Sequence, residues 1–394
     1  MKIAKLAAAT AAVALLAGCT TVTTGDATKD PSFKPGDAIV SLLNPGNYPT
    51  VPKPGPAMKP GPESGRIIDG ERMGDYVVGP WEIDPQLLHV GFTSTGLLFS
   101  VVSLLSPELD QLAQQHHLIY GFGSGRHTDV DADHLRKLQN TVLRFPSPDE
   151  AAAAASGFYT RHPGIHDPST KLNLPIPGHP ESQALQVTMP DGTFATSIIS
   201  PHGPYVLIQS GTAQESPGVS LQLATKSLDL QASRIDNFKP TDPSQFATMQ
   251  TDPEGLLSRT VPTKEHKANQ GLWGPRGLLH FEDDPVQTAA ALTAAGVDVI
   301  SVRGTYLYRA KDATTAAQLA QKLAEPGGSS PSEPGPTVPG LPAAKCRAIN
   351  YAEVKALVYD CTASFDRWVY VASSLQPFDA TQRMASQYLL LTAK

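Results

Sequence analysis

The sequence is poor in charged residues, and its charges are not gathered into runs of one sign. Asp, Glu, Lys and Arg make up 17% of the 394 residues, against about 25% in a typical globular protein, and the formal net charge is −6. Proteins that bind the phosphate backbone of DNA or RNA present a basic face, usually with interleaved aromatic residues. The missing basic face leads us to expect that nucleic acid is not a partner.

Long hydrophobic runs are also missing. The apolar run Leu6–Ala17 is shorter than the roughly 20 residues that a membrane-spanning helix needs. Two lysines stand at its start, and the tetrapeptide LAGC closes it at Cys19. This is the layout of a cleavable bacterial lipoprotein signal. We therefore expect residues 1–18 to be a signal peptide and Cys19 to be the lipidated N-terminus, which would anchor an extracytoplasmic protein to the cell membrane.

Cysteine is scarce, with three residues in the whole chain. Once Cys19 carries lipid, Cys346 and Cys361 remain, in a compartment where disulfide bonds persist. We predict one disulfide bond between them, which would add about 3 kcal/mol by the loop-closure estimate. The alternative is a pair of buried free thiols.

Metal and cofactor motifs are absent in spite of eleven histidines. His162 and His166 are four residues apart, but the intervening Pro163-Gly164 prevents a helix from placing them on one face, and no Cys or Glu completes a zinc pattern. The alternating carboxylates of Asp129–Asp133 lack the glycine and glutamate of a calcium loop. We predict that they cap a short helix over residues 134–139, and the alternative is an irregular, weak cation site. We expect no metal and no cofactor.

The glycine run Gly121–Gly125 matches no nucleotide-binding pattern. It lacks the third glycine of the dinucleotide fingerprint and the Gly-Lys-Ser/Thr ending of a phosphate-binding loop, and Ser124 is not flanked by the glycines of a nucleophile elbow. We therefore predict a flexible loop here. Because no nucleophile and base, and no close carboxylate pair, can be assembled from the sequence, no catalytic residue is assigned.

Proline is abundant in two segments. Residues 19–66 carry prolines and glycines at a density that disfavours regular structure, so we predict a lipidated, extended tether that holds the folded part away from the membrane. A second tract, residues 326–342, is predicted to be a surface loop. Residues 161–181 form another long Pro/His segment, which we expect to be disordered.

The remaining sequence divides into two halves with the same order of predicted elements. We predict a first α+β domain over residues 67–238, a linker over 239–265, and a second α+β domain over 266–394. Each is expected to be a mostly antiparallel sheet with helices packed on one face, in a ferredoxin-like or related layout that arose by internal duplication. The alternative is two unrelated α+β domains.

Gly-Pro corners precede the first predicted strand of each half. These strands are residues 87–90 and 278–281, and they would place His89 and His280 at equivalent structural positions. Trp81 and Trp273 lie next to the Gly-Pro corners. Core packing is the ordinary role of tryptophan, but a position near the domain junction makes both candidates for ligand contact.

The segment RMGDYVVGPWEID, residues 72–84, resembles the opening signature of a family of mycobacterial and nocardial cell-envelope lipoproteins of unknown function. The lipobox cysteine, the proline-rich tether and the segment RWVYVA, residues 367–372, agree with this resemblance. It implies a surface-exposed, immunogenic lipoprotein of an actinobacterium. It brings no catalytic residues.

Two functions follow from these observations. The first is a non-catalytic binding or interaction module of the cell envelope, which takes an apolar or glycosidic ligand, a glycolipid or a partner protein in the cleft between its two domains. The second is an unrecognised cell-wall hydrolase. The missing catalytic pattern favours the module, although catalytic groups that are distant in sequence can meet in the fold.

Overall fold

The computed structural model describes residues 36–54, 59–90, 95–102, 106–167, 170–265, 267–325, 331–351 and 356–393. The predicted signal peptide, Cys19 and the first part of the predicted tether lie outside the described residues.

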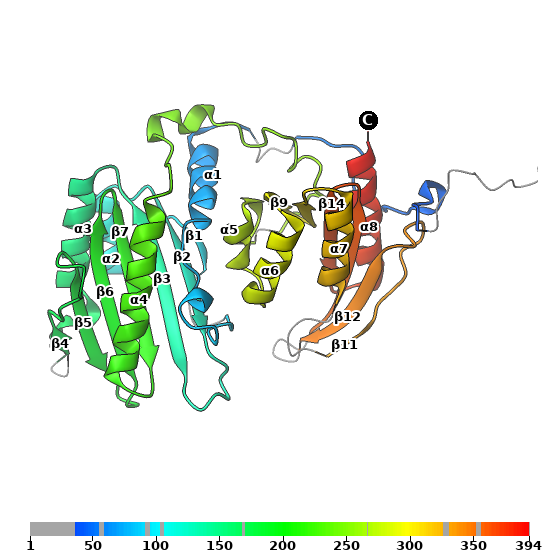
Figure 1. Ribbon diagram of the computed structural model, residues 1–394. Coiled ribbons are helices and arrows are strands. Elements are labelled where there is room, and N and C mark those ends of the chain that lie inside the picture. Colours follow the sequence, from blue (N-terminus) through cyan, green and yellow to red (C-terminus); the bar gives the residue numbers. More distant parts are fainter. Residues whose placement is uncertain are drawn as a thin grey trace, which may run out of the picture. The chain divides into compact units, whose positions relative to one another are not determined.

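The first half of the chain forms a seven-stranded antiparallel sheet (Figure 1). Its strand order is β1-β2-β3-β7-β6-β5-β4. The strands are β1 Gly96–Leu98, β2 Tyr120–His127, β3 Arg136–Arg144, β4 Lys171–Leu172, β5 Gln183–Thr188, β6 Phe194–His202 and β7 Tyr205–Ala213.

The second half forms another seven-stranded antiparallel sheet, in the order β8-β9-β10-β14-β13-β12-β11 when it is followed from its β8 edge. The strands are β8 Gly271–Trp273, β9 Val299–Val302, β10 Tyr306–Arg309, β11 Ser332–Pro334, β12 Lys345–Tyr351, β13 Ala356–Phe365 and β14 Trp368–Ser374. This is the order of the first sheet, strand for strand. The predicted fold class, two similar α+β domains with antiparallel sheets, is confirmed.

Proline begins seven of the eight α-helices in the described part of the chain, because its missing N–H costs nothing in the first turn. The α-helices are α1 Pro62–Gly74, α2 Pro107–Gln115, α3 Pro148–Thr160, α4 Pro217–Ile235, α5 Pro275–Leu279, α6 Pro285–Ala295, α7 Ala313–Ala324 and α8 Pro377–Thr392. The described 3-10 helices are η1 Val40–Leu42, η3 Pro80–Glu82, η4 Pro163–His166 and η5 Pro243–Thr248. Helix α7 instead has Asp312 as its N-cap residue, which forms a capping box with Thr315. Helix α3 is capped by Ser147, whose side chain accepts a hydrogen bond from Glu150 N.

Helices cover both faces of each sheet, and not one face as the sequence suggested. On β3, Val142 belongs to the cluster with Leu228 of α4, whereas its neighbour Leu143 packs with Phe158 of α3. On β10, Tyr308 lies in the cluster that includes α7, and Leu307 packs with Met384 of α8. Neighbouring strand residues face opposite ways, so two buried faces need two layers of helix.

Several local predictions were wrong. The glycine run is not a loop: it lies inside β2, whose residues are all buried. Residues 134–139 do not form a helix, because β3 begins at Arg136. The predicted first strands are also absent. His89 makes only an isolated bridge to His127, and residues 278–281 finish α5 and the turn after it, so His89 and His280 are not equivalent. Residues 161–181 contain η4 and β4, so this segment is not wholly without structure.

The segment after the undescribed N-terminal residues packs on the second domain. Ile39 N donates to Gly340 O at 2.8 Å, Tyr48 Oη donates to Asp379 Oδ1 at 2.6 Å, and Ser386 Oγ of α8 donates to Pro49 O at 2.6 Å. This part of the predicted tether is therefore attached to α8.

The predicted linker, residues 239–265, is also packed. Phe246 and Val261 are buried, and Val261 N donates to Gln387 Oε1 of α8 at 3.1 Å.

Candidate functional site

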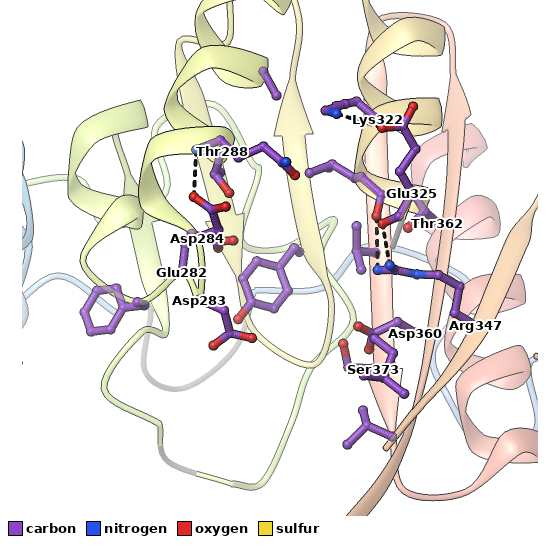
Figure 2. Close-up of a pocket in the computed structure, with 18 of the residues that line it drawn as sticks. Glu282, Asp283, Asp284, Thr288, Lys322, Glu325, Arg347, Asp360, Thr362 and Ser373 are labelled. Atoms are coloured by element: carbon purple, nitrogen blue, oxygen red, sulfur yellow. Dashed lines mark hydrogen bonds and ion pairs between the residues drawn. The ribbon is translucent and has the colours of Figure 1, made fainter. Parts of the chain in front are cut away.

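A cavity of about 380 Å³ lies over one face of the second sheet (Figure 2). Alternate residues of a strand share a face, and such residues from neighbouring strands form its floor. They are Tyr306 and Tyr308 of β10, Val371 and Ser373 of β14, Val358, Asp360 and Thr362 of β13, and Arg347, Ile349 and Tyr351 of β12. Residues 281–284 and the start of α6 form one wall, and the end of α7 forms the other. The cavity is thus the part of this sheet face that lies between the two helices.

The basic side chains of the cavity form hydrogen bonds with residues at the end of α7. Lys322 Nζ donates to Glu325 Oε2 at 2.7 Å. The Arg347 guanidinium donates to the main-chain oxygens of Leu323 and Glu325, which are free carbonyls at the helix C-terminus. Figure 2 shows these contacts on the side of the cavity opposite Glu282 and Asp283.

Three carboxyl groups of the cavity, those of Glu282, Asp283 and Asp360, have no ion pair with any described basic residue. Asp284 is different, because its Oδ1 caps α6 by accepting from Gln287 N at 2.8 Å. Asp283 Oδ2 accepts only a long bond, 3.4 Å, from Tyr351 Oη. Asp360 Oδ1 is buried and has no hydrogen-bond partner among the described residues. The cavity therefore carries carboxyl groups that no ion pair within the described structure neutralises.

Burial raises the pKa of the Glu282 carboxyl to about 7. The neighbouring Asp283 and Asp360 raise this pKa further, while Arg126 lowers it. Burial also raises the pKa of Asp360, against the lowering effects of Ser373 and Arg347. Desolvation and neighbouring carboxyl groups keep a carboxyl protonated to a higher pH. Near neutral pH, a bound cation can therefore replace a proton in the cavity.

Two tyrosines form an aromatic part of the floor. The rings of Tyr306 and Tyr308 are 13° from parallel, with centroids 6.2 Å apart. Tyr306 Oη accepts a hydrogen bond from Asn269 Nδ2 at 2.6 Å. Tyr308 is 3% exposed, and its hydroxyl has no hydrogen-bond partner in the described structure. The hydroxyl can donate or accept a hydrogen bond, so it is available to a ligand in the cavity.

The first domain offers an internal comparison, because the two sheets can be aligned on their matching hairpins. The β6–β7 hairpin closes at the pair His202 and Tyr205, and the β13–β14 hairpin at Phe365 and Trp368. Following the strand pairing outward from these closing pairs gives the equivalent positions: Ser197 for Asp360, Leu185 for Arg347, Thr141 for Tyr306 and Leu143 for Tyr308.

In the first domain this face is filled by core side chains. Leu143 and Leu185 are buried in the cluster that α2 and α3 complete. The same strand order thus supports an apolar core in one domain and a charged, tyrosine-lined cavity in the other.

The tryptophans proposed as ligand contacts lie in the core, and neither lines this cavity. Trp81 is 7% exposed and Trp273 is 1% exposed. Trp273 Nε1 donates to Asn269 O at 2.7 Å, so its polar atom is satisfied inside the protein. His280 is also buried, between Ser124 Oγ at 2.8 Å and Gly74 O at 3.0 Å, and burial lowers its pKa to about 4. It is a neutral core histidine.

The disulfide bond between Cys346 and Cys361 is present and joins β12 to β13. Their neighbours Arg347 and Asp360 face each other across the same two strands and line the cavity. The bond therefore fixes the register of two strands that build the site.

Sequence reasoning did not identify the cavity residues. One feature of the sequence could have indicated the cavity, namely the polar residues that alternate along β12 and β13. A strand face that is covered by helices does not need polar residues for packing. The described residues contain no group of three or more His, Cys, Asp or Glu side chains that could hold a metal ion.

The comparisons with known proteins give a family and a distant structural likeness. No curated protein matches the chain. Among solved structures, the extracellular domain of PknH from Mycobacterium tuberculosis is similar at 13% sequence identity and a TM-score of 0.29, over 42% of this chain and 96% of that chain. Within the described residues, none of the helices has the length and apolar character needed to cross a membrane. One family model, described as "Domain of unknown function (DUF7373) N-terminal", matches residues 57–251, and its C-terminal counterpart matches residues 256–394, so the chain belongs to the two-domain DUF7373 family.

Proposed function

We propose that the protein is a lipid-anchored, extracytoplasmic module of the cell envelope that binds a small ligand in the cavity of its second domain and does not transform it. The observation that carries the binding role is the cavity of about 380 Å³, because it contains a buried carboxyl oxygen, Asp360 Oδ1, that has no hydrogen-bond partner among the described residues. Unsatisfied buried polar groups are costly, and a ligand would satisfy them. The charged lining does not suit a wholly apolar ligand.

The location rests on the sequence. The lipoprotein signal that ends at Cys19 supports anchoring to the membrane, and a disulfide bond agrees with an oxidising compartment. Mass spectrometry of the native protein should show an acylated N-terminal cysteine. A Cys19→Ala protein should lose its partition into detergent, and full retention there would contradict the anchor.

The binding role can be tested on the full-length protein purified from its own host. Native mass spectrometry should show a non-covalent small molecule that is lost on denaturation. The variant Tyr308→Leu should lose it, because it fills the floor with the residue that stands at the equivalent position 143 of the first domain. Retention of the same molecule by this variant would exclude the cavity as its site.

A hydrolase acting on cell-wall glycans is the second candidate, and one observation favours it. Glycosidases use a protonated carboxyl beside a second carboxylate, and Glu282, with its pKa raised to about 7, has Asp283 and Asp360 as neighbours. The described structure shows no hydrogen bond between any two of these carboxyls. Release of reducing sugar from purified cell wall, abolished by Glu282→Gln, would establish the hydrolase instead.

A further inference from the structure

We infer that the ligand presents an alkylammonium group, which binds between the carboxyl groups of Glu282, Asp283 and Asp360 and over the rings of Tyr306 and Tyr308. This inference rests on the proposed function in one respect, that the cavity is the ligand site. It adds the chemical class of the ligand.

The charge of the cavity determines the sign of the charge that the ligand carries. The three carboxyls form no ion pair within the described structure, and Arg126 and Arg347 attract Glu282 and Asp360 only at longer range. Lys322 and Arg347 are already bonded to Glu325 and to the end of α7. A buried carboxylate is stable only when it is paired or hydrogen-bonded. A cation that enters the cavity would therefore meet carboxyl groups that have no ion pair on the side of residues 282 and 283.

The arrangement of the carboxyls favours a larger cation over a bare metal ion. Metal ions need several ligand atoms within about 2.6 Å of one centre, and the described residues hold no group of three or more side chains that meets this need. The carboxyls come from the loop before α6 and from β13, with the cavity between them. An ammonium group on a carbon chain spans such a space, because its N–H donors reach separate acceptors.

The tyrosines supply the remaining features of an ammonium site. The two nearly parallel rings give a π surface, which attracts ammonium groups within about 6 Å of a ring centroid. The Tyr308 hydroxyl and Asp360 Oδ1, both without described partners, are acceptors for its N–H groups. Quaternary ammonium has no N–H and would leave these atoms unsatisfied, so we commit to a primary alkylammonium.

The experiment is titration calorimetry on the full-length protein in detergent, with cadaverine as the cationic probe and 1-pentanol and glutarate as uncharged and anionic probes. At pH 7.5 cadaverine should bind saturably at one site per chain, and the other two probes should not. Equal binding of pentanol would overturn the inference in favour of an apolar site. Absence of cadaverine binding would overturn it too.

Two variants replace cavity residues by those that the first domain carries at equivalent positions, so a similar strand environment already accommodates them. They are Tyr308→Leu, matched to Leu143, and Asp360→Ser, matched to Ser197. Each should weaken cadaverine binding at least about tenfold, since hydrogen bonds to charged groups contribute about 1.5–3 kcal/mol. The exposed Asp133→Asn removes the same charge elsewhere and should change affinity less than about twofold. Unchanged affinity in both cavity variants, with cooperative thermal unfolding retained, would overturn the inference.

Affinity should also depend on pH. Glu282 faces Asp283 beside it, Asp360 on β13, Arg126 on β2, and Tyr306 and Tyr308 on β10. Its carboxyl loses its proton near pH 7 while an alkylamine stays charged, so cadaverine affinity should rise from pH 6 to pH 8.

The variant Glu282→Gln should flatten this rise, and an unaltered pH profile would contradict the assigned contact. If native mass spectrometry shows a bound molecule that Tyr308→Leu removes while cadaverine fails to bind, the proposed function stands and the ammonium inference fails.

Discussion

Arg126 of β2, in the first domain, donates a hydrogen bond of 2.7 Å from Nη2 to the main-chain oxygen of Glu282, in the second. The same guanidinium donates to Leu88 O at 2.6 Å and to His280 O at 2.9 Å, and the side chain is almost fully buried, at 1% exposure. Burial lowers the pKa of Arg126 to about 10, although Asp283 and Glu282 raise it. A cation of the first domain thus holds the chain segment that carries the cavity acids.

The substitution Arg126→Met should lower the free energy of unfolding by about 3–5 kcal/mol, because the carbonyls around it would be buried without donors. Arg126→Lys should lose less, since an ammonium keeps the charge and some of the bonds. Urea denaturation measures both, with the exposed Arg161→Met as control. A loss no larger than that of the control would show that these bonds do not stabilise the protein.

Removal of the disulfide bond should affect both stability and the site. The double variant Cys346→Ser, Cys361→Ser should lose about 3 kcal/mol by the loop-closure estimate. Its affinity for cadaverine should fall as well, because the bond lies beside Arg347 and Asp360. Thiol titration of the denatured, unreduced wild-type protein should find no free thiol at these positions, and a reactive pair would contradict the bond.

Asp69 is the centre of a buried polar network in the first domain. Fully buried, it accepts hydrogen bonds from Arg72, Tyr120, Arg144 and Thr241. The substitution Asp69→Asn would leave Arg144 buried without its counter-charge, so we expect a loss of about 3–5 kcal/mol in urea denaturation. The exposed Asp133→Asn should cost less than about 0.5 kcal/mol, and similar losses for the two variants would argue against the network.

Glu71 gives stability a specific pH dependence. Burial raises the pKa of its carboxyl from 4.5 to about 8, against the lowering effect of a hydrogen bond from Leu272 N. The folded protein therefore retains a proton that the unfolded chain loses above pH 4.5, and this carboxyl makes stability fall as pH rises from about 4.5 to 8.

We expect Glu71→Gln to gain stability relative to wild type across this window, by up to about 1.4 kcal/mol per pH unit. His280, with its pKa lowered to about 4, acts with the opposite sign between pH 6.5 and 4, but it is common to both proteins and cancels in the comparison. A constant difference between the two proteins from pH 5 to pH 8, measured by urea denaturation, would contradict the raised pKa.

Secondary-structure elements that have a local sequence pattern could be predicted from the sequence. Elements whose conformation depends on close packing against distant residues could not. The hairpin of β6 and β7 follows a local pattern, because two strand-favouring segments flank the His202-Gly203 turn, where Gly203 has φ 53°. The glycine run Gly121–Gly125 predicts a loop because glycine is common in loops, and this prediction is wrong. In the structure, a Cβ at Gly121 would lie 2.5 Å from Leu143 Cδ2, so the glycine permits close strand packing.

The cavity could not be predicted for a different reason. Glu282, Tyr308, Arg347 and Asp360 are scattered over the second domain, and only the strand order brings β10, β13 and β12 to one floor. No local spacing encodes that order. The residue type of Trp81 and Trp273 favoured them as ligand contacts, but both side chains lie in the core.

The contact between residues 38–50 and α8 determines where a mechanical load would act. The chain reaches the second domain before it enters the first, and the bonds of Tyr48 to Asp379 and of Pro49 to Ser386 attach it there. Tension applied to the N-terminal side would thus pull on the C-terminal helix of the second domain, while helix α1 and the first sheet lie beyond the attachment point. In a protein pulled from that end, the domain with the cavity would bear the force and the domain with the filled core would be shielded from it.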